Sequence, residues 1–242
     1  SRWKARFLTR LDPGFELFET MRADAGRIAL RARHRARLAA SAAALGFAFD
    51  GAAFEAALDA ALATLPAGPR RLRLALAHDG RLTLTHAALA PLPPGPVTLR
   101  WADAPLPATR MLPRHKTTLR AAYDAGVRAA EAQGDFDTLF VDEAGVLLEG
   151  GRSSVFVRLD GQWFTPPLGD GVLPGVMRGA LLADPAWAAQ ERRLTRADVE
   201  GAQALVVCNA LRGALPARLR DAPAQRSQSD TCSWPGSTSP LP

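Results

Sequence analysis

The sequence contains little lysine, little cysteine and no long apolar run. Lysine occurs only as Lys4 and Lys116 among 30 basic residues, so the other 28 are arginine. Cys208 lies in an apolar run and Cys232 in a polar segment, which excludes a framework of disulfides and fits a reducing compartment. The longest apolar runs, such as 39–49, are too short to cross a bilayer, and no signal-peptide pattern opens the sequence. We therefore expect a cytoplasmic protein with no membrane partner.

Metal and nucleic-acid signatures are also missing. The four histidines show no zinc-like spacing among themselves or with the cysteines, so we expect no metal site. The net charge is +6 and the pI is about 10.5. The arginines are dispersed, however, and the densest group, at 31–37, is not interleaved with aromatic residues. A small anionic substrate explains this charge as well as RNA does, and we expect no nucleic-acid partner.

The chain is expected to form two small α/β (α+β) domains. With 242 residues, of which 48% are hydrophobic, it can bury one large core or two small ones. Prolines punctuate residues 91–107, so the boundary should lie near the end of this stretch. The predicted organisation is a linker remnant at 1–14, a small domain at 15–103, an interdomain loop at 104–110, a large cofactor-binding domain at 111–220 and a disordered tail at 221–242.

Local patterns predict the order of helices and strands. Asp50 is a candidate N-cap for a helix that ends before Pro66, and Asp79-Gly80 predicts a hairpin turn. The expected helices are 32–46, 52–65, 118–133, 176–183 and 196–201. The expected strands are 15–21, 27–30, 72–77, 82–86, a short one through Trp101, 138–141, 146–149, 155–159, 163–165, 190–194 and 205–209.

Lys116 is the first candidate for a reactive group. Arginine stays protonated in proteins, whereas a lysine can lose its proton and attack a carbonyl to form a Schiff base. A lysine kept where arginine has replaced almost every other one therefore suggests chemistry. Most lysines are nevertheless solvated surface residues, so only the context of Lys116 can decide.

A glycine-rich loop at 169–175 leads into the predicted helix 176–183. The spacing of its glycines is not that of a dinucleotide fingerprint. Backbone amides of such a loop and the N-terminus of the following helix can still bind an anion, although a plain strand-to-helix turn would look the same. Together with Lys116, the loop suggests an aldehyde cofactor that carries a phosphate. Pyridoxal 5′-phosphate (PLP) requires a lysine, an acid for its ring nitrogen and a phosphate-binding cup.

Seven short motifs along residues 15–216 resemble those of the class-IV aminotransferases, the fold-type IV PLP enzymes. In sequence order they are FETMR at 18–22, His34-x-x-Arg37-Leu38, HKTT at 115–118, EGGRSSVF at 149–156, TPP at 165–167, GVLPGVMR at 171–178 and CNALRG at 208–213. No single motif is decisive, but seven in this order are highly specific. The resemblance implies a two-domain fold like that of the D-amino acid and branched-chain aminotransferases, working as a homodimer.

Within this family the chain is most similar to the aminodeoxychorismate lyases, which convert aminodeoxychorismate to p-aminobenzoate and pyruvate in folate biosynthesis. It resembles in particular the lyase domain fused behind aminodeoxychorismate synthase component I, because Lys4–Leu8 stands in place of the usual N-terminal strands. That resemblance predicts a segment of a longer polypeptide with a synthase domain as partner. Two other hypotheses remain: a transaminase of D-amino or branched-chain amino acids, and a non-catalytic module that stabilises a synthase.

The resemblance also implies roles for individual residues. Lys116 would form the Schiff base with PLP, and Glu149 would pair with the ring nitrogen. Thr20 would protonate the departing enolpyruvate, at a place where branched-chain aminotransferases have glycine. Arg37 would bind the cofactor phosphate, and it lies three residues from His34 on one face of a helix.

Backbone groups complete the implied site. The amides of Val176 and Met177 and the turn at Asn209-Ala210 would help to hold the phosphate. The family usually has asparagine where this chain has Ser154, so local support of the cofactor is expected to differ there.

Overall fold

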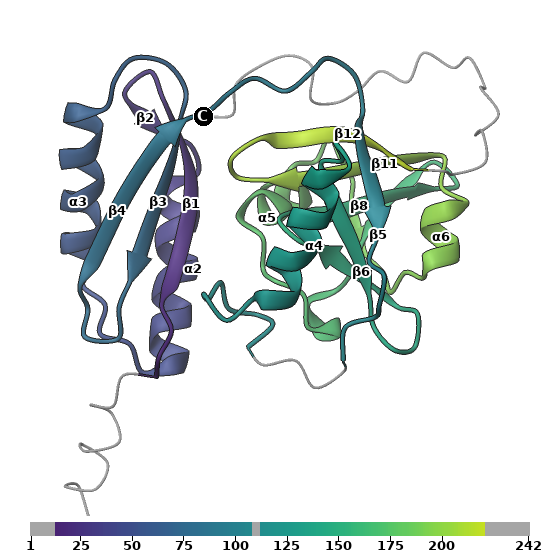
Figure 1. Cartoon of the computed structure of the whole chain (residues 1–242), viewed down its shortest axis with the longest axis horizontal. Coiled ribbons are helices and arrows are strands. Elements are labelled where there is room, and N and C mark those ends of the chain that lie inside the picture. The colour runs from purple at the N-terminus through teal and green to yellow at the C-terminus, as the bar shows by residue number, and fades with distance from the viewer. Residues whose placement is uncertain (1–12, 108–111, 221–242) are drawn as a thin grey trace, which may run out of the picture. The chain divides into compact units, whose positions relative to one another are not determined.

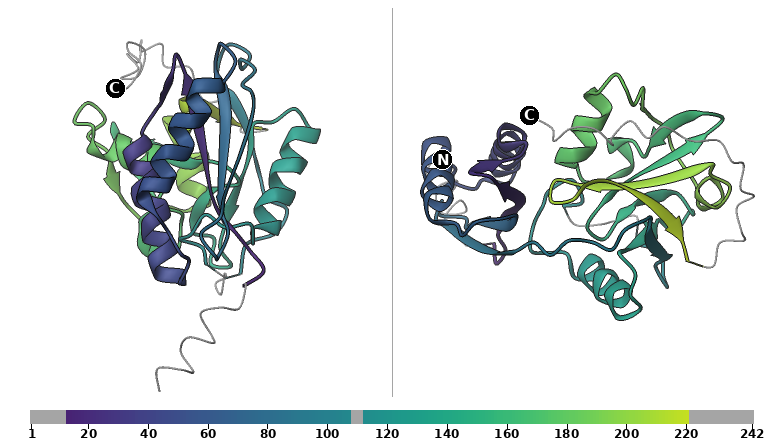
Figure 2. Two further views of the ribbon diagram at one scale, coloured as in Figure 1. Left: turned by 90° about the vertical axis from the view of Figure 1, so that its left-hand side faces the viewer. Right: turned by 90° about the horizontal axis from the view of Figure 1, so that it is seen from above.

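The computed structural model describes residues 13–107 and 112–220, which form two compact units (Figures 1 and 2). Within the described residues, unit 1 comprises 13–92 and 115–119, and unit 2 comprises 93–107, 112–114 and 120–220. The predicted tail, residues 1–12 of the predicted linker remnant and residues 108–110 of the predicted loop lie outside the described residues. The mixture of helices and strands confirms the predicted α/β class.

Unit 1 is an antiparallel four-stranded sheet with two helices on one face (Figure 1). The strands are β1 (Leu17–Asp24), β2 (Arg27–Ile28), β3 (Arg70–Leu76) and β4 (Leu82–Ala88), in the order β2-β1-β3-β4. The helices are α2 (Arg31–Leu45) and α3 (Gly51–Thr64). Buried leucines and Met21 from alternate positions of β1 and β3 pack against Leu38, Phe54 and Leu58 of these helices.

The register of β1 and β3 determines what each face of this sheet carries. Leu17, Glu19 and Met21 of β1 point toward the helices, because their partners on β3 are core leucines. Phe18, Thr20 and Arg22 therefore point to the other face.

Unit 2 is an eight-stranded sheet that curls, with helices packed against it (Figure 2). The strand order is β10-β9-β8-β11-β12-β5-β6-β7. The strands are β5 (Val97–Trp101), β6 (Asp137–Val141), β7 (Leu147–Gly150), β8 (Ser154–Leu159), β9 (Gln162–Thr165), β10 (Gln190–Glu191), β11 (Ala204–Asn209) and β12 (Gly213–Leu219). The helices are α4 (Ala121–Ala132), α5 (Val176–Ala183), α6 (Arg196–Glu200) and the short 3-10 helix η1 (Leu168–Asp170).

Three features differ from the sequence-based expectation, and each depends on contacts between distant residues. β5 pairs with β12 and β6 of unit 2, so the division falls at Leu92 instead of at residue 103. The segment His115–Leu119 groups with unit 1 instead of with the large domain. β12 was not expected at all. It contains Pro216, which cannot donate a ladder hydrogen bond and makes the segment look like a loop.

Among the described residues there is no helix with the length and apolar character that crossing a bilayer requires.

The N-cap of α3 allows a first test. Asp50 accepts hydrogen bonds from the amides of Ala52 (2.8 Å) and Ala53 (3.2 Å), as its position in the sequence predicted. We expect Asp50→Ala to lower the free energy of unfolding by about 1 kcal/mol, because two helix amides lose their acceptor. Asp50→Ser, which keeps an acceptor, should stay within about 0.5 kcal/mol of wild type in urea unfolding. Equal losses for the two variants would contradict a capping role.

Candidate active site

Lys116 lies on a short segment that runs beside the start of β1 in unit 1. Lys116 accepts a hydrogen bond through its carbonyl from the amide of Phe18 (2.9 Å), and the amide of Thr118 donates to the carbonyl of Glu16 (3.0 Å). Thr117 forms an antiparallel bridge with Leu17 between these two bonds. The Lys116 ammonium lies 4.6 Å from the centre of the Phe18 ring. Backbone pairing therefore fixes the position of Lys116 relative to β1.

A side-chain contact connects the same segment to α2. His115 Nδ1 lies 3.0 Å from the hydroxyl of Ser41, and Ser41 is itself buried. Ser41 is one helical turn beyond Arg37, on the side of α2 that faces the sheet. The lysine segment is thus tied both to β1 and to the helix that carries Arg37.

Thr20 belongs to the face of the unit 1 sheet that Phe18 occupies. It stands directly opposite Arg73 of β3, so the two side chains point to the same side of the sheet. The Arg73 guanidinium also lies 4.6 Å from the centre of the Phe18 ring. Hence an amine and a guanidinium pack on one aromatic ring in unit 1, on the sheet face that also carries Thr20.

Arg37 forms a buried ion pair in unit 1. It donates to both carboxylate oxygens of Glu19, through Nε (2.8 Å) and through an Nη, and His34 Nδ1 lies 2.6 Å from Glu19 Oε2. Glu19 is 1% exposed. Burial by itself would raise the pKa of Glu19, but attraction to Arg37 and hydrogen bonds from His34 and Arg37 outweigh it and lower the pKa to about 2. His34 and Arg37, which lie three residues apart on one helix face, therefore both contact the carboxylate of Glu19.

Glu149 lies on β7 in unit 2 and is 7% exposed. Its carboxylate accepts a hydrogen bond from the hydroxyl of Tyr123 (3.1 Å), the only tyrosine of the chain. The amide of Leu173, in the glycine-rich loop, lies 3.3 and 3.2 Å from the two carboxylate oxygens. These contacts hold an acid in one orientation, as a partner of a cofactor ring nitrogen requires.

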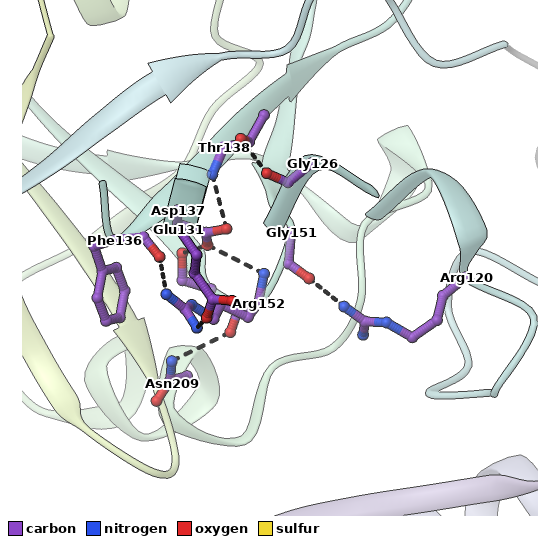
Figure 3. A network of polar contacts seen from close by, with 10 residues as sticks. Arg120, Gly126, Glu131, Phe136, Asp137, Thr138, Gly151, Arg152 and Asn209 are labelled. Carbon is purple, nitrogen blue, oxygen red and sulfur yellow. Dashed lines mark hydrogen bonds and ion pairs between the residues drawn. The ribbon is translucent and has the colours of Figure 1, made fainter. Parts of the chain in front are cut away.

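The turn that follows Glu149 is held by a dense polar network (Figure 3). Asp137 accepts hydrogen bonds from the amide of Arg152 (3.1 Å) and from the hydroxyl of Ser153 (2.5 Å). The carbonyl of Gly151 accepts from the guanidinium of Arg120. The Arg152 side chain extends to Glu131 (2.7 Å) and to the carbonyl of Phe136.

The N-terminus of α5 follows the glycine-rich loop directly. α5 spans Val176–Ala183, as expected, and no side chain caps its N-terminus at Gly175. The amides of Val176 and Met177 are in the first turn, where a helix has unpaired N–H groups and the positive end of its dipole. A Cβ at Gly175 would lie 2.6 Å from the Ser154 hydroxyl, so only glycine fits there without a shift. This donor set suits a phosphate.

The turn at Asn209-Ala210 joins β11 to β12 and is braced by Asn209 itself. The side-chain carbonyl of Asn209 accepts from the amides of Leu211 (3.1 Å) and Arg212 (2.8 Å). Its side-chain amide donates to the carbonyl of Arg152 (3.2 Å). The second predicted phosphate-binding turn is thereby connected to the turn that follows Glu149.

The predicted site residues divide between the two units. Thr20, Arg37 and Lys116 belong to unit 1, and Glu149, Val176, Met177, Asn209 and Ala210 belong to unit 2. Sequence reasoning did not assign roles to Glu19, Tyr123 or Asp137. The single occurrence of tyrosine was the one signal that could have drawn attention to Tyr123. Over residues 13–107 and 112–220, no group of three or more His, Cys, Asp or Glu side chains could hold a metal ion.

The buried ion pair gives a pH-dependent prediction. The pKa of Glu19 falls from 4.5 to about 2 on folding, so its contribution to stability is complete above pH 4.5 and is lost as the pH falls through about 2. We expect Glu19→Gln to lower the free energy of unfolding by about 3 kcal/mol at pH 7. The difference from wild type should shrink in urea unfolding at pH 3.

Glu200→Gln is the control for this test. It breaks the exposed pair between Glu200 and Arg196 and should cost at most about 0.5 kcal/mol. A Glu19→Gln loss of the same size at both pH values would contradict the ionic role of Glu19.

Comparisons with known proteins identify the family of the chain. Residues 16–219 match the family model of amino-transferase class IV. A solved structure from Mesorhizobium loti, provisionally named an amino-acid aminotransferase, is 38% identical, covers 85% of this chain and 100% of that chain, and has a TM-score of 0.78. A structure provisionally named 4-amino-4-deoxychorismate lyase is 26% identical, covers 85% of each chain and has a TM-score of 0.75.

A third structure, of a hypothetical aminotransferase from Mycobacterium tuberculosis in its PLP-bound form, is 25% identical. The match covers 88% of this chain and 84% of that chain, with a TM-score of 0.74. No curated protein sequence matches the chain. The family match over most of the sequence, together with the lysine, the buried acid and the helix N-terminus described above, leads to one conclusion. The chain belongs to the amino-transferase class IV family and is an enzyme of that PLP-dependent family.

Proposed function

We propose that this protein is a lyase that converts aminodeoxychorismate to p-aminobenzoate and pyruvate, a step of folate biosynthesis. The observation that carries the proposal is the hydroxyl of Thr20, which points from β1 to the sheet face where the Lys116 amine packs on Phe18. A lyase needs such a proton donor for its departing enolpyruvate. The 26% identical structure named as a lyase of this substrate supports the same choice.

The residues present fit PLP. Lys116 is the amine for its aldehyde, Glu149 is the acid for its ring nitrogen, and the amides of Val176 and Met177 with Arg37 and the Asn209-Ala210 turn are donors for its phosphate. Glu19 accepts hydrogen bonds from one edge of the Arg37 guanidinium and so fixes the orientation of the planar group. When bound, the cofactor supplies an electron sink for the carbon next to the substrate nitrogen.

The proposed roles of the individual residues are the following. Glu149 keeps a proton on the ring nitrogen. With the cofactor bound, the amine of Lys116 would remove the proton from the substrate ring carbon that bears the nitrogen. The bond between the neighbouring carbon and the enolpyruvyl oxygen then breaks, and the ring becomes aromatic. Thr20 donates a proton to the departing enolpyruvate, which becomes pyruvate.

The charge of the sheet face supports an anionic substrate. Arg22 stands opposite Arg71, and Thr20 stands opposite Arg73, so three guanidinium groups come from the face that also carries Phe18. Aminodeoxychorismate carries two carboxylates. Bidentate arginine contacts are the usual means of recognising such groups.

A second candidate function is transamination of D-amino or branched-chain amino acids. It would use the same cofactor residues and return a keto acid. The 38% identical structure from Mesorhizobium loti, named as an amino-acid aminotransferase, is the observation that favours it. Thr20 favours the lyase, because branched-chain aminotransferases have glycine at this place.

The first test measures both reactions on the PLP-loaded protein. We expect p-aminobenzoate from aminodeoxychorismate at a rate well above amino exchange between alanine and a keto acid. Thr20→Gly should reduce lyase turnover while transamination stays unchanged. Faster amino exchange than p-aminobenzoate formation would overturn the lyase proposal. Failure to take up PLP at all would favour a non-catalytic role beside a synthase.

The lysine assignment can be checked without measuring turnover. After reduction with borohydride, we expect the cofactor to be attached covalently to Lys116 and not to Lys4. Lys116→Ala should abolish this attachment, and Lys4→Ala, the only other lysine in the chain, is the matched control. Mass spectrometry of the digested protein reads the result. Attachment that persists in Lys116→Ala would remove Lys116 from the site.

Arg73 tests the substrate class. We expect Arg73→Gln to raise KM for aminodeoxychorismate about tenfold to a hundredfold, because one charge-assisted contact is lost. Arg70→Gln is the control on the same strand, since Arg70 donates to the carbonyls of Pro66 and Ala67. Unchanged KM in Arg73→Gln would exclude this residue from carboxylate binding.

A further inference from the structure

Asp137, at the start of β6, is a fully buried carboxylate that no role assigned so far explains. Its side chain is 0% exposed. One oxygen accepts from the amide of Thr138 (2.8 Å), and the other accepts from the amide of Arg152 (3.1 Å) (Figure 3). The second oxygen also accepts from the hydroxyl of Ser153 (2.5 Å). Burial of a carboxylate costs free energy unless its oxygens are hydrogen-bonded. The full set of hydrogen bonds to Asp137 therefore indicates a structural role for this residue.

The contacts of Asp137 suit an acceptor and nothing else. Every neighbour that hydrogen-bonds to it in the described structure donates, and an ionised carboxylate is an acceptor only. Burial raises the pKa of Asp137, while the hydrogen bonds from Ser153, Arg152 and Thr138 oppose that rise. An asparagine would turn an N–H group toward at least one of the two backbone N–H groups. The geometry therefore requires the carboxylate itself.

Asp137 also fills the space inside the turn at Gly150–Ser153. A Cβ at Gly150 would meet Asp137 Oδ2 and would lie 2.5 Å from the Ser153 hydroxyl. A Cβ at Gly151 would lie 3.1 Å from Asp137 Oδ1 and 2.7 Å from a methyl group of Val127. The two glycines are therefore needed so that the backbone can close around this carboxylate. The amide of Gly150 completes the turn by donating to the carbonyl of Ser153 (2.8 Å).

This turn begins at the residue after Glu149. The pairs Leu139–Gly150 and Val141–Leu147 hold the backbone on either side of Glu149, with an irregular register between them. The Glu149 carboxylate meets Tyr123 on α4 and the amide of Leu173, neither of which belongs to the turn. Movement of the turn would therefore shift Glu149 away from both partners.

We propose that Asp137 is a positioning residue for Glu149: by closing the Gly150–Ser153 turn it sets the orientation in which the Glu149 carboxylate meets the ring nitrogen of the cofactor. The proposal rests on the proposed role of Glu149. Asp137 does not touch the cofactor and acts only through Glu149.

The test is a double-mutant cycle read by cofactor binding. PLP is titrated into the purified full chain of wild type, Asp137→Ala, Glu149→Gln and the double variant, and both the dissociation constant and the visible absorbance of the lysine-bound cofactor are recorded. We expect Asp137→Ala to weaken PLP binding about tenfold and to change the absorbance in the same direction as Glu149→Gln. In the Glu149→Gln background, Asp137→Ala should weaken binding by less than about twofold.

Asp142→Ala is the matched control, because Asp142 caps the turn at the other end of the same hairpin. It accepts from the amides of Ala144 (3.0 Å) and Val146 (2.8 Å). We expect this variant to lose stability while the dissociation constant and the absorbance of bound PLP stay at wild-type values. Should Asp137→Ala not fold, Ser153→Ala replaces it in the cycle and removes one of the three hydrogen bonds.

The outcomes separate this proposal from the proposed function. If Glu149→Gln alone leaves PLP binding and absorbance unchanged, the assignment of Glu149 fails. If Glu149→Gln changes them but the loss from Asp137→Ala is the same in both backgrounds, Asp137 does not act through Glu149 and the present proposal is overturned. A change in the Asp142→Ala absorbance as large as that of Asp137→Ala would likewise overturn it.

Discussion

The buried pair of Glu19 with Arg37 and His34 is the interaction on which the organisation of unit 1 depends. Glu19 points from β1 into the helix face, where an unpaired charge would be very costly. The pair therefore fixes the rotation of α2 against β1. Because strand residues alternate, placing Glu19 inward places Phe18 and Thr20 outward. The same side of α2 carries Ser41, which contacts His115 beside Lys116. The ion pair of Glu19 with Arg37 therefore orients α2 and, through Ser41, the segment that carries Lys116.

Unit 2 uses a buried carboxylate for a related purpose but pairs it differently. Glu19 meets a full positive charge, and its pKa falls. Asp137 meets two backbone amides and a hydroxyl, and burial raises its pKa despite them. A formal charge nearby compensates for lost hydration far better than neutral dipoles do. Glu19 binds Arg37 in unit 1, and Asp137 closes the turn that follows Glu149 in unit 2. Each of the two acids thus supports a residue that is proposed to contact the cofactor.

The sequence predicted the local features well and the distant ones poorly. The bounds of α5 and the cap at Asp50 depend on neighbouring residues, and both agree with the structure. The place of β5 in the larger sheet depends on its pairing with β12. The sequence did not predict β12, because Pro216 makes that segment resemble a loop. Asp137 lay just before the predicted strand 138–141 and received no role, because the turn that it closes is 13 or more residues away. The homodimer, the synthase partner and the roles of the individual site residues stay predictions.

The single tyrosine has a practical consequence. Tyr123 donates to Glu149 and packs edge-on against Phe140, with ring centres 5.1 Å apart. Because no other tyrosine is present, fluorotyrosine supplied during expression would label one position only. One fluorine resonance would then come from the hydroxyl-bearing ring next to the proposed cofactor acid. The composition of this chain thus provides a built-in spectroscopic reporter, at the point where the electrostatics of the site are set.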